Sequence, residues 1–197
     1  QGSQTAPTAN QNPHPISSAL TNSSPNPIST PDSTPELRIL ALSSEELAEV
    51  KANPIVAANN RFAFKLFNAL SEGQLQKNLF VSPLSVSLAL QMTWNGAKNE
   101  TKAEMAKALE IDGLNPEQVN RGSSLLMRKL HKPAEDIQLA VANGIFANDR
   151  FELLPEFVKK NKENYFSEIR SIHFSNGATQ AEINDWASKA TEQKIPQ

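Results

Sequence analysis

The sequence predicts an α+β fold in which helices outnumber strands. Apolar residues recur at positions i, i+3, i+4 and i+7 in several stretches, as on one face of a helix, whereas a period of two is confined to residues 137–145. Two or three short strands make too small a sheet to cover the apolar faces of this many helices. The sequence therefore predicts that further strands are encoded beyond Gln197, with a compact helical domain carrying one hairpin as the alternative.

Residues 1–41 form the first predicted region, a polar tether that is disordered. Residues 1–35 contain seven of the 13 prolines, many Ser and Thr, and Asp32 as the one charged side chain. A segment of this composition cannot bury enough apolar surface to offset its chain entropy. We expect it either to hold an exported domain away from a surface or to be a terminus without a role. The folded region is expected over residues 42–197.

Two helices are expected at the start of the folded region. Ser43 and Glu46 have the spacing of a capping box, which predicts a short helix running to Lys51. Asn53-Pro54 ends this helix because the residue before a proline disfavours helical backbone. A longer helix follows and ends near Gly73, with one apolar face formed by Ala63, Leu66, Phe67 and Leu70.

A short strand and a core helix are expected next. Asn78–Val81 is apolar and bounded by polar residues, which favours a buried strand. Ser82 then provides an N-cap, and Pro83 occupies the first helical position. From Pro83 to about Thr93 the apolar residues leave no wide polar face, so this helix is expected to be surrounded by protein.

Two further helices are predicted from their starts. Thr101 and Glu104 have capping-box spacing and predict a helix towards Leu109. Asn115-Pro116 opens another, because proline is favoured in the first turn of a helix.

The last third of the chain alternates strands with helices. A strand is expected over residues 137–145, with Asn143 as the polar member of its apolar row, and such a side chain needs hydrogen-bond partners. Pro155 begins a helix, and residues 170–174 form a short strand. A final helix is indicated by the helical spacing of Ile183, Trp186, Ala187 and Ala190.

Residues 78–105, NLFVSPLSVSLALQMTWNGAKNETKAEM, are similar to a characteristic stretch of the serpins, in which a strand runs through Ser-Pro into a buried helix. Four further segments resemble the family in the same order: RFAFKLFNAL (61–70), VANGIFAN (141–148), LLPEFVKKNKENYFSEIRSIHF (153–174) and INDWASKATEQKIP (183–196). Five collinear matches are far more specific than one motif. The resemblance implies the N-terminal half of the serpin fold, a multi-domain α/β fold, with helices A to F and strands 6B, 2A and 1A.

The resemblance implies a serine-type endopeptidase inhibitor that traps its target as a suicide substrate. The protease cleaves an exposed reactive-centre loop, which lies beyond this chain, and the cut loop inserts as a strand into the large sheet A with the enzyme still attached. The native state must therefore be kinetically trapped until cleavage. A non-inhibitory serpin with a carrier, chaperone-like or storage role is one alternative, and an unrelated α/β enzyme is another.

The resemblance also assigns residues to a gate, or shutter, where sheet A opens. The matching positions are Ser82, Ser85, Asn143 and Asn184, with Pro83 fixing the start of the helix. Hydroxyls and amides suit a gate because each hydrogen bond contributes only about 1 kcal/mol net, so the cluster can open and re-form. From the residues alone, Ser82 would cap the helix, Ser85 would face a backbone carbonyl, and the two asparagines would satisfy buried backbone groups.

Composition and motifs bound the function. A net charge of -2 gives no basic surplus for nucleic acid, and the sequence has no apolar run near the ~20 residues that span a bilayer. Cysteine is absent, and the three histidines have no zinc-binding spacing, so we expect no cofactor, no metal and no enzymatic activity. The expected protein is an extracellular monomer whose partner, bound through the loop, is a serine protease or a cysteine protease.

Four basic residues form a candidate polyanion-binding face on or near the helix that matches serpin helix D: Arg121, Arg128, Lys129 and Lys132. Most charge runs on helices are solvated faces, and nearby acidic residues dilute this one. We also expect this chain by itself to inhibit nothing and to be poorly soluble, because its strand edges lack partners.

Overall fold

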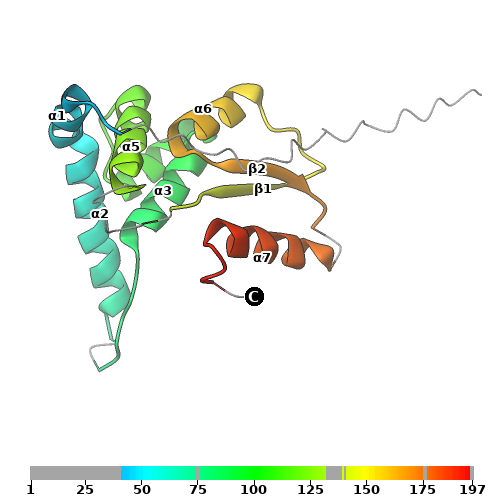
Figure 1. Cartoon of the computed structure of the whole chain (residues 1–197). Coiled ribbons are helices and arrows are strands. Elements are labelled where there is room, and N and C mark those ends of the chain that lie inside the picture. Colours follow the sequence, from blue (N-terminus) through cyan, green and yellow to red (C-terminus); the bar gives the residue numbers. More distant parts are fainter. Residues whose placement is uncertain (1–40, 74–75, 132–138, 140, 175–176, 196–197) are drawn as a thin grey trace, which may run out of the picture. The chain divides into compact units, whose positions relative to one another are not determined.

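A computed structural model describes residues 41–73, 76–131, 139, 141–174 and 177–195, all within one compact unit spanning residues 37–197 (Figure 1). The tether predicted over residues 1–41 lies outside the described part except for its last residue, so the domain division stays a prediction. The elements are α1 (Ser44–Ala52), α2 (Pro54–Ser71), α3 (Pro83–Trp94), α4 (Asn99–Ala108), α5 (Pro116–His131), β1 (Gly144–Asn148), α6 (Pro155–Tyr165), β2 (Glu168–Ile172) and α7 (Ala178–Ala190).

The first two helices begin at side-chain caps. The predicted capping box of α1 is confirmed: the Glu46 amide donates to Ser43 Oγ at 3.1 Å, and the Ser43 amide donates to Glu46 Oε2 at 3.0 Å. One residue later the chain enters α2, because Asn53 Oδ1 accepts from the Ile55 amide at 2.9 Å and Pro54 takes the first helical position.

The apolar face predicted for α2 is only partly buried. Its buried residues are Ile55, Ala58, Asn59 and Phe62, all in the N-terminal half, which packs against α3 and α5. Phe67 and Leu70, which the spacing placed on the buried face, are exposed. The spacing identified an apolar face, but whether another element covers it depends on tertiary structure.

The segment before α3 departs most from expectation. Residues 78–81 form no strand in the described part of the chain, and Phe80 is 99% exposed. The prediction of a buried strand is wrong here because no described segment pairs with it. The bounds of α3 agree with the prediction, but the helix is not surrounded: Leu88 and Met92 are buried, whereas Val86 and Leu90 are exposed.

The next two helices show how a cap is selected. The capping box predicted at Thr101 is wrong, because α4 already begins at Asn99 and Thr101 lies inside its first turn. Glu104 pairs instead with Lys107, at 2.9 Å. The start of α5 is confirmed: the Gln118 amide donates to Asn115 Oδ1 at 2.9 Å, and the Asn115 amide donates to Gln118 Oε1 at 3.3 Å.

A parallel strand pair joins the last part of the chain. In its register Gly144 lies opposite Glu168 and Asn148 opposite Ile172, with α6 as the crossover between the strands. β1 begins later than predicted, since Leu139 and residues 141–143 are not in a strand and residues 137, 138 and 140 lie outside the described part. β2 covers residues 168–172 rather than 170–174. The predicted face of α7 is half-buried.

Buried apolar side chains form two clusters on either side of α3. The first joins α2, α3, α4 and α5 and contains Ile55, Ala58, Phe62, Trp94, Ala106, Leu109, Ile111 and Val119. The second contains Leu88, Met92, Met127 and Tyr165. Complete burial of a side chain such as Leu88 contributes about 1.5–3 kcal/mol relative to exposure. α3 and α5 thus both supply residues to the two clusters and are the central helices of the described fold.

Candidate functional site

Two of the predicted gate residues lie at the start of α3. Ser82 Oγ and Ser85 Oγ are 2.8 Å apart and share a hydrogen bond, and both residues are exposed. Ser82 occupies the predicted N-cap position of α3, but its side chain makes no capping hydrogen bond. Pro83 takes the first helical position as predicted. The hydroxyl of Ser82 is thus held by its neighbour one helical turn away.

Asn143 lies at a corner where three elements meet. Its side chain is buried, and its Nδ2 donates to the backbone oxygen of Tyr165, the last residue of α6, at 2.8 Å. Its own backbone oxygen accepts from the Glu168 amide, at the start of β2, at 2.9 Å. Asn143 therefore ties the end of α6 to the beginning of the strand pair. The expectation that this polar side chain needs partners is confirmed.

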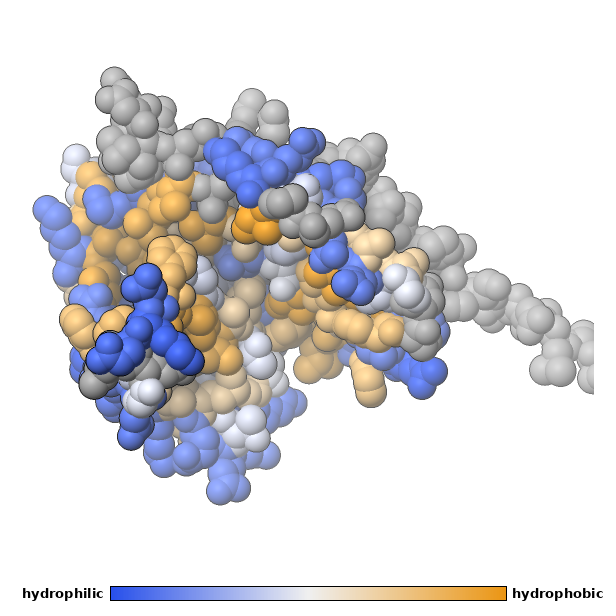
Figure 2. All heavy atoms as spheres, turned by 90° about the horizontal axis from the view of Figure 1, so that it is seen from below, coloured by the Kyte–Doolittle hydropathy of each residue, from blue (hydrophilic) through white to orange (hydrophobic). Residues whose placement is uncertain are grey.

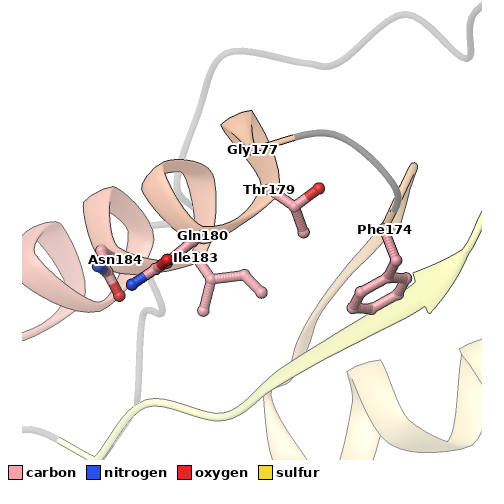
Figure 3. Close-up of a pocket in the computed structure, with 6 residues that line it drawn as sticks. All are labelled: Phe174, Gly177, Thr179, Gln180, Ile183 and Asn184. Carbon is pink, nitrogen blue, oxygen red and sulfur yellow. The ribbon is translucent and has the colours of Figure 1, made fainter.

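Asn184 lies on α7 and is half-buried. It lines a hollow of about 360 Å³ together with Phe174, Thr179, Gln180 and Ile183, and Figure 3 shows these side chains with that of Asn184 further along α7. The lining combines apolar groups with two carboxamides.

The structure brings the predicted gate residues together only in part. Within the described residues a hydrogen bond joins Ser82 to Ser85, whereas none joins either serine to Asn143 or Asn184. The four side chains therefore do not form a single bonded cluster here, and their role as a gate remains a prediction.

A buried polar seam that sequence analysis missed runs between the central helices. Gln91 Nε2 donates to Ser87 Oγ at 2.8 Å and to Asn59 Oδ1 at 3.1 Å, and Ser87 Oγ donates to the same oxygen at 2.7 Å. On the other side, Ser123 Oγ donates to Gln91 Oε1 at 2.6 Å. The seam thus joins α2, α3 and α5 by hydrogen bonds within a largely apolar interior.

The seam continues through Tyr165 to a group of asparagines. The Tyr165 hydroxyl donates to Asn120 Oδ1 at 2.8 Å and lies 3.4 Å from Gln91 Oε1. Asn120 and Asn95 exchange hydrogen bonds of 3.0 and 3.1 Å, and Asn95 Nδ2 lies 3.3 Å from Asn161 Oδ1. Burial raises the pKa of the Tyr165 phenol, so this group keeps its proton and remains a donor.

One sequence signal pointed to the seam. Ser87 and Gln91 are polar residues four positions apart in a helix that was predicted to be apolar on all sides, so they share one face. Asn143 was noticed for the same kind of reason, because it interrupts an apolar row. The partners on α2, α5 and α6 carry no such signal, since their own helices have polar faces.

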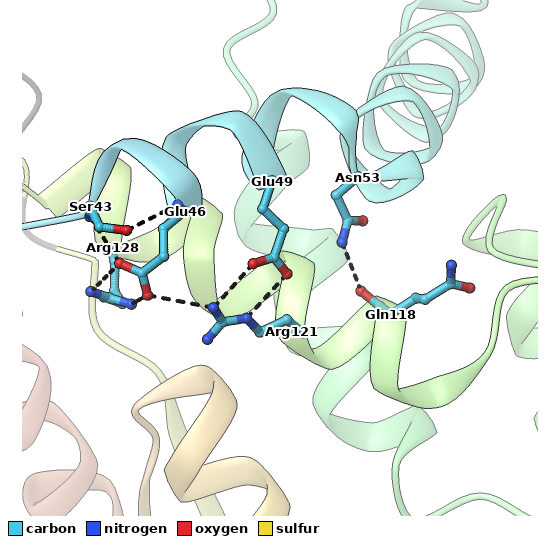
Figure 4. A network of polar contacts seen from close by, with 7 residues as sticks. All are labelled: Ser43, Glu46, Glu49, Asn53, Gln118, Arg121 and Arg128. Atoms are coloured by element: carbon cyan, nitrogen blue, oxygen red, sulfur yellow. Dashed lines mark hydrogen bonds and ion pairs between the residues drawn. The ribbon is translucent and has the colours of Figure 1, made fainter.

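Two of the four basic residues predicted to bind polyanions, Arg121 and Arg128, form ion pairs within the protein (Figure 4). Arg128 Nη1 lies 2.6 Å from Glu46 Oε1, and Arg121 Nη2 lies 3.1 Å from Glu49 Oε2, so α1 is clamped to α5. The hydrogen bond from Arg128, with one from the Ser43 amide, lowers the pKa of Glu46 from 4.5 to about 2. Lys129 is exposed, and Lys132 lies outside the described residues.

A second set of contacts holds α7 beside the strands. Trp186 Nε1 donates to Glu168 Oε2 at 2.7 Å, and Arg170 bridges Glu168, at 2.6 Å, and Glu182, at 3.4 Å. The rings of Phe146 and Trp186 pack edge to face with centroids 5.3 Å apart. Gly144 leaves room for Trp186, since a Cβ there would lie 2.9 Å from the indole.

The described part of the chain also bears on two other functional classes, metal sites and membrane spans. It contains no group of three or more His, Cys, Asp or Glu side chains placed to hold a metal ion. His173 follows β2, and its Nδ1 lies 3.0 Å from Asp149 Oδ2. None of the helices described is both long and apolar enough to cross a membrane.

Comparison with known proteins assigns the fold. Residues 57–197 match the family described as Serpin (serine protease inhibitor). The leukocyte elastase inhibitor of Bos taurus is 36% identical over 143 residues, which are 72% of this chain and 37% of that protein. The alpha-1-antitrypsin of Meriones unguiculatus is 31% identical over 160 residues, which are 79% of this chain and 39% of that protein.

Solved structures agree with this assignment. Human thyroxine-binding globulin superposes with a TM-score of 0.64 at 29% identity, covering 73% of this chain and 40% of the globulin. Emu ovalbumin gives a TM-score of 0.65 at 28% identity, with 72% and 40% covered. The chain spans about two fifths of the length of these relatives. Over that length the predicted resemblance is confirmed, and the chain belongs to the serpin family.

Proposed function

We propose that the full-length protein inhibits a serine endopeptidase and that this chain supplies the N-terminal part of its scaffold. The observation that carries the proposal is the match of residues 57–197 to a family described as serine protease inhibitors, together with relatives named elastase inhibitors. A serine protease is thus the first target class to test, and a cysteine protease is the second.

The proposed mechanism is that implied by the family resemblance. A reactive-centre loop in the remaining part of the protein is offered as substrate, and after cleavage it inserts as a new strand into the sheet to which β1 and β2 belong. This chain then provides the strands and the helices that carry them rather than the loop. The free-energy difference between the native and the loop-inserted states drives the trap.

The gate role of Ser82, Pro83, Ser85, Asn143 and Asn184 is part of this proposal. Two geometric features support it. Ser82 and Ser85 bond only to each other among the described side chains, through one exposed hydrogen bond, so separating them costs little. Asn143 lies at the first residue before β1 and holds both α6 and β2, so a change in the sheet at this point must alter its bonds.

The test is incubation of the full-length protein with trypsin-like, chymotrypsin-like and elastase-like enzymes, followed by denaturing gel electrophoresis. We expect a complex with at least one protease that survives denaturation, at the summed mass of the enzyme and the cleaved inhibitor. A catalytically inactive Ser variant of the same protease is the control and should form none. Cleavage without a stable complex for every enzyme would contradict inhibition.

That negative result would favour the second candidate, a non-inhibitory carrier or storage role. The observation behind it is that the solved relatives include a thyroxine-binding globulin in complex with its ligand, and an ovalbumin. The extracellular location and the monomeric state are proposed with either role, on the strength of the polar N-terminal region. Detection of the protein in the culture medium of expressing cells tests the location. Its mass by light scattering tests the monomeric state.

We also propose polyanion binding by the four basic residues Arg121, Arg128, Lys129 and Lys132. The ion pairs of the two arginines argue against this role. Glu46 and Glu49 already neutralise the two arginines. Retention on a sulfated polysaccharide column at the ionic strength of blood would support this role, and a Lys129→Ala variant should then elute earlier. Elution with the unbound fraction would exclude it.

A further inference from the structure

The proposed gate has two parts, Ser82 and Ser85 at the start of α3 and Asn143 before β1. Buried side chains of α3 and α6 lie between them. Six residues after Ser85 and nine after Ser82, α3 carries Gln91, which is fully buried. Tyr165 has hydrogen bonds to both Gln91 and Asn143.

Tyr165 meets Asn143 through its backbone. It is the last residue of α6, and Phe166 ends the helix in the left-handed conformation, with φ at 50°. The last carbonyls of a helix have no intrahelical donor, so the Tyr165 oxygen is free to accept from Asn143 Nδ2 at 2.8 Å. Where this carbonyl lies therefore depends on where the end of α6 is held.

The side chain of Tyr165 fixes that end. Its ring belongs to the apolar cluster with Leu88 and Met92, and its hydroxyl donates to Asn120 at 2.8 Å and lies 3.4 Å from Gln91 Oε1. The residue has no exposed surface. A buried donor without a partner costs about 1–3 kcal/mol, so the hydroxyl holds α6 against α3 and α5 at one defined position.

We propose that Tyr165 is a positioning residue that couples Asn143, and through it the start of the β1–β2 pair, to the central helix α3. The inference rests on the proposed gate and adds to it a residue outside the predicted set. A shift of Asn143 relative to α3 must then break its bond to the Tyr165 carbonyl or pull the end of α6 away from Gln91 and Asn120. The coupling therefore restrains premature opening of the sheet.

The variant that tests the coupling is Tyr165→Phe in the full-length protein. It removes the hydroxyl but keeps the ring, and it leaves neither acceptor unpaired: Gln91 Oε1 still accepts from Ser123, and Asn120 Oδ1 still accepts from Asn95. The variant is thus expected to fold. Val119→Ala is the matched control, because Val119 is fully buried in the other apolar cluster.

The first measurement is amide hydrogen exchange at Glu168, whose N–H donates to the Asn143 backbone oxygen. We expect exchange there to become roughly fivefold faster in Tyr165→Phe, as follows from the loss of one net hydrogen bond, and to stay unchanged in Val119→Ala once global stability is subtracted. Unchanged protection at Glu168 in Tyr165→Phe would overturn the inference. This result does not depend on whether the protein inhibits a protease.

The second measurement is the rate at which the warmed inhibitor loses activity by inserting its own loop. We expect Tyr165→Phe and Asn143→Ser each to raise this rate. The double variant should raise it by less than the product of the two single fold-changes, because both substitutions break the same chain of hydrogen bonds from Asn143 to α3. Val119→Ala combined with Asn143→Ser should be multiplicative. Multiplicative effects for the Tyr165 pair would overturn the coupling, whereas a wild-type protein that never inhibits would overturn only the proposed function.

Discussion

The helices α2, α3, α5 and α6 enclose a buried interior, whereas the strands β1 and β2 with α7 are only partly buried. In α2, α3, α5 and α6, two apolar clusters and a continuous polar seam occupy the interior, with Leu88, Gln91, Ser123 and Tyr165 fully buried. In the strand part, every residue of β1 is only half-buried, and α7 is held mainly by the side chains around Trp186. Figure 2 shows apolar side chains interspersed among polar ones on one face of the molecule.

The difference follows from how each element pairs its backbone. A helix satisfies its own amides and carbonyls and needs neighbours only for its apolar face, whereas a strand depends on other strands for both. In the described part of the chain, the helices therefore enclose an interior of their own, whereas the sheet consists of one strand pair. Phe80 and the C-terminal half of α2 are exposed as well, and no strand among the described residues covers them.

The largest effects on stability are expected at Leu88, which is fully buried among the helices, and at Phe80, which is almost fully exposed. Leu88→Ala should lower the free energy of unfolding of the full-length protein by about 2–5 kcal/mol, because a fully buried leucine leaves a cavity. Phe80→Ala should cost about 3–5 kcal/mol in the full-length protein if further strands cover it there. Urea unfolding followed by circular dichroism measures both. A negligible cost for Phe80→Ala would mean that this surface stays open and that the comparison is wrong.

An intermediate effect is expected at the attachment of α7 to the strands. Gly144→Ala places a methyl group 2.9 Å from the Trp186 indole, and overpacking of this kind costs about 1–3 kcal/mol. The displaced indole should become more accessible to acrylamide quenching, while buried Trp94 provides the unquenched background. Gly177→Ala is the control, since nothing lies within 4 Å of a Cβ there and its φ is -63°. Equal quenching of both variants would show that Trp186 is not held by this fit.

The smallest effect is expected at the clamp between α1 and α5, and it depends on pH. The folded-state pKa of Glu46 is about 2 against 4.5 when unpaired, so its contribution to stability is fully present above about pH 4.5 and is lost as pH falls towards 2. Glu46→Gln keeps a capping-box side chain but removes the charge. The difference in Tm between wild type and variant should be constant from neutral pH to about 4.5 and then shrink.

Glu163→Gln is the matched control for this titration. Glu163 lies on a helix and forms an exposed pair with Lys159 at 4.0 Å, which contributes little in water. Its difference from wild type should be small at every pH. A difference for Glu46→Gln that does not narrow in acid would mean that the pair with Arg128 does not stabilise the fold.

Local chemistry determined much of the fold in advance. The capping boxes at Ser43 and Asn115, and the prolines at Pro83 and Pro155, set four helix starts within the sequence itself, because a cap is satisfied by residues three positions away. The capping box predicted at Thr101 is absent because α4 begins two residues earlier, at Asn99, and Thr101 is therefore inside the helix rather than at its N-cap. Of the proposed gate, the sequence singled out Asn143, whose need for partners was visible in an apolar row.

The sequence by itself thus determined the family, the order of the helices and the presence of two strands that partly overlap β1 and β2, because these depend on local spacing and on motifs along the chain. Only the tertiary structure decided which apolar faces are covered, which arginines are neutralised by α1, and that Tyr165 joins Gln91 to Asn143. Such contacts connect residues far apart in the chain, and their energy depends on distances that no local pattern encodes.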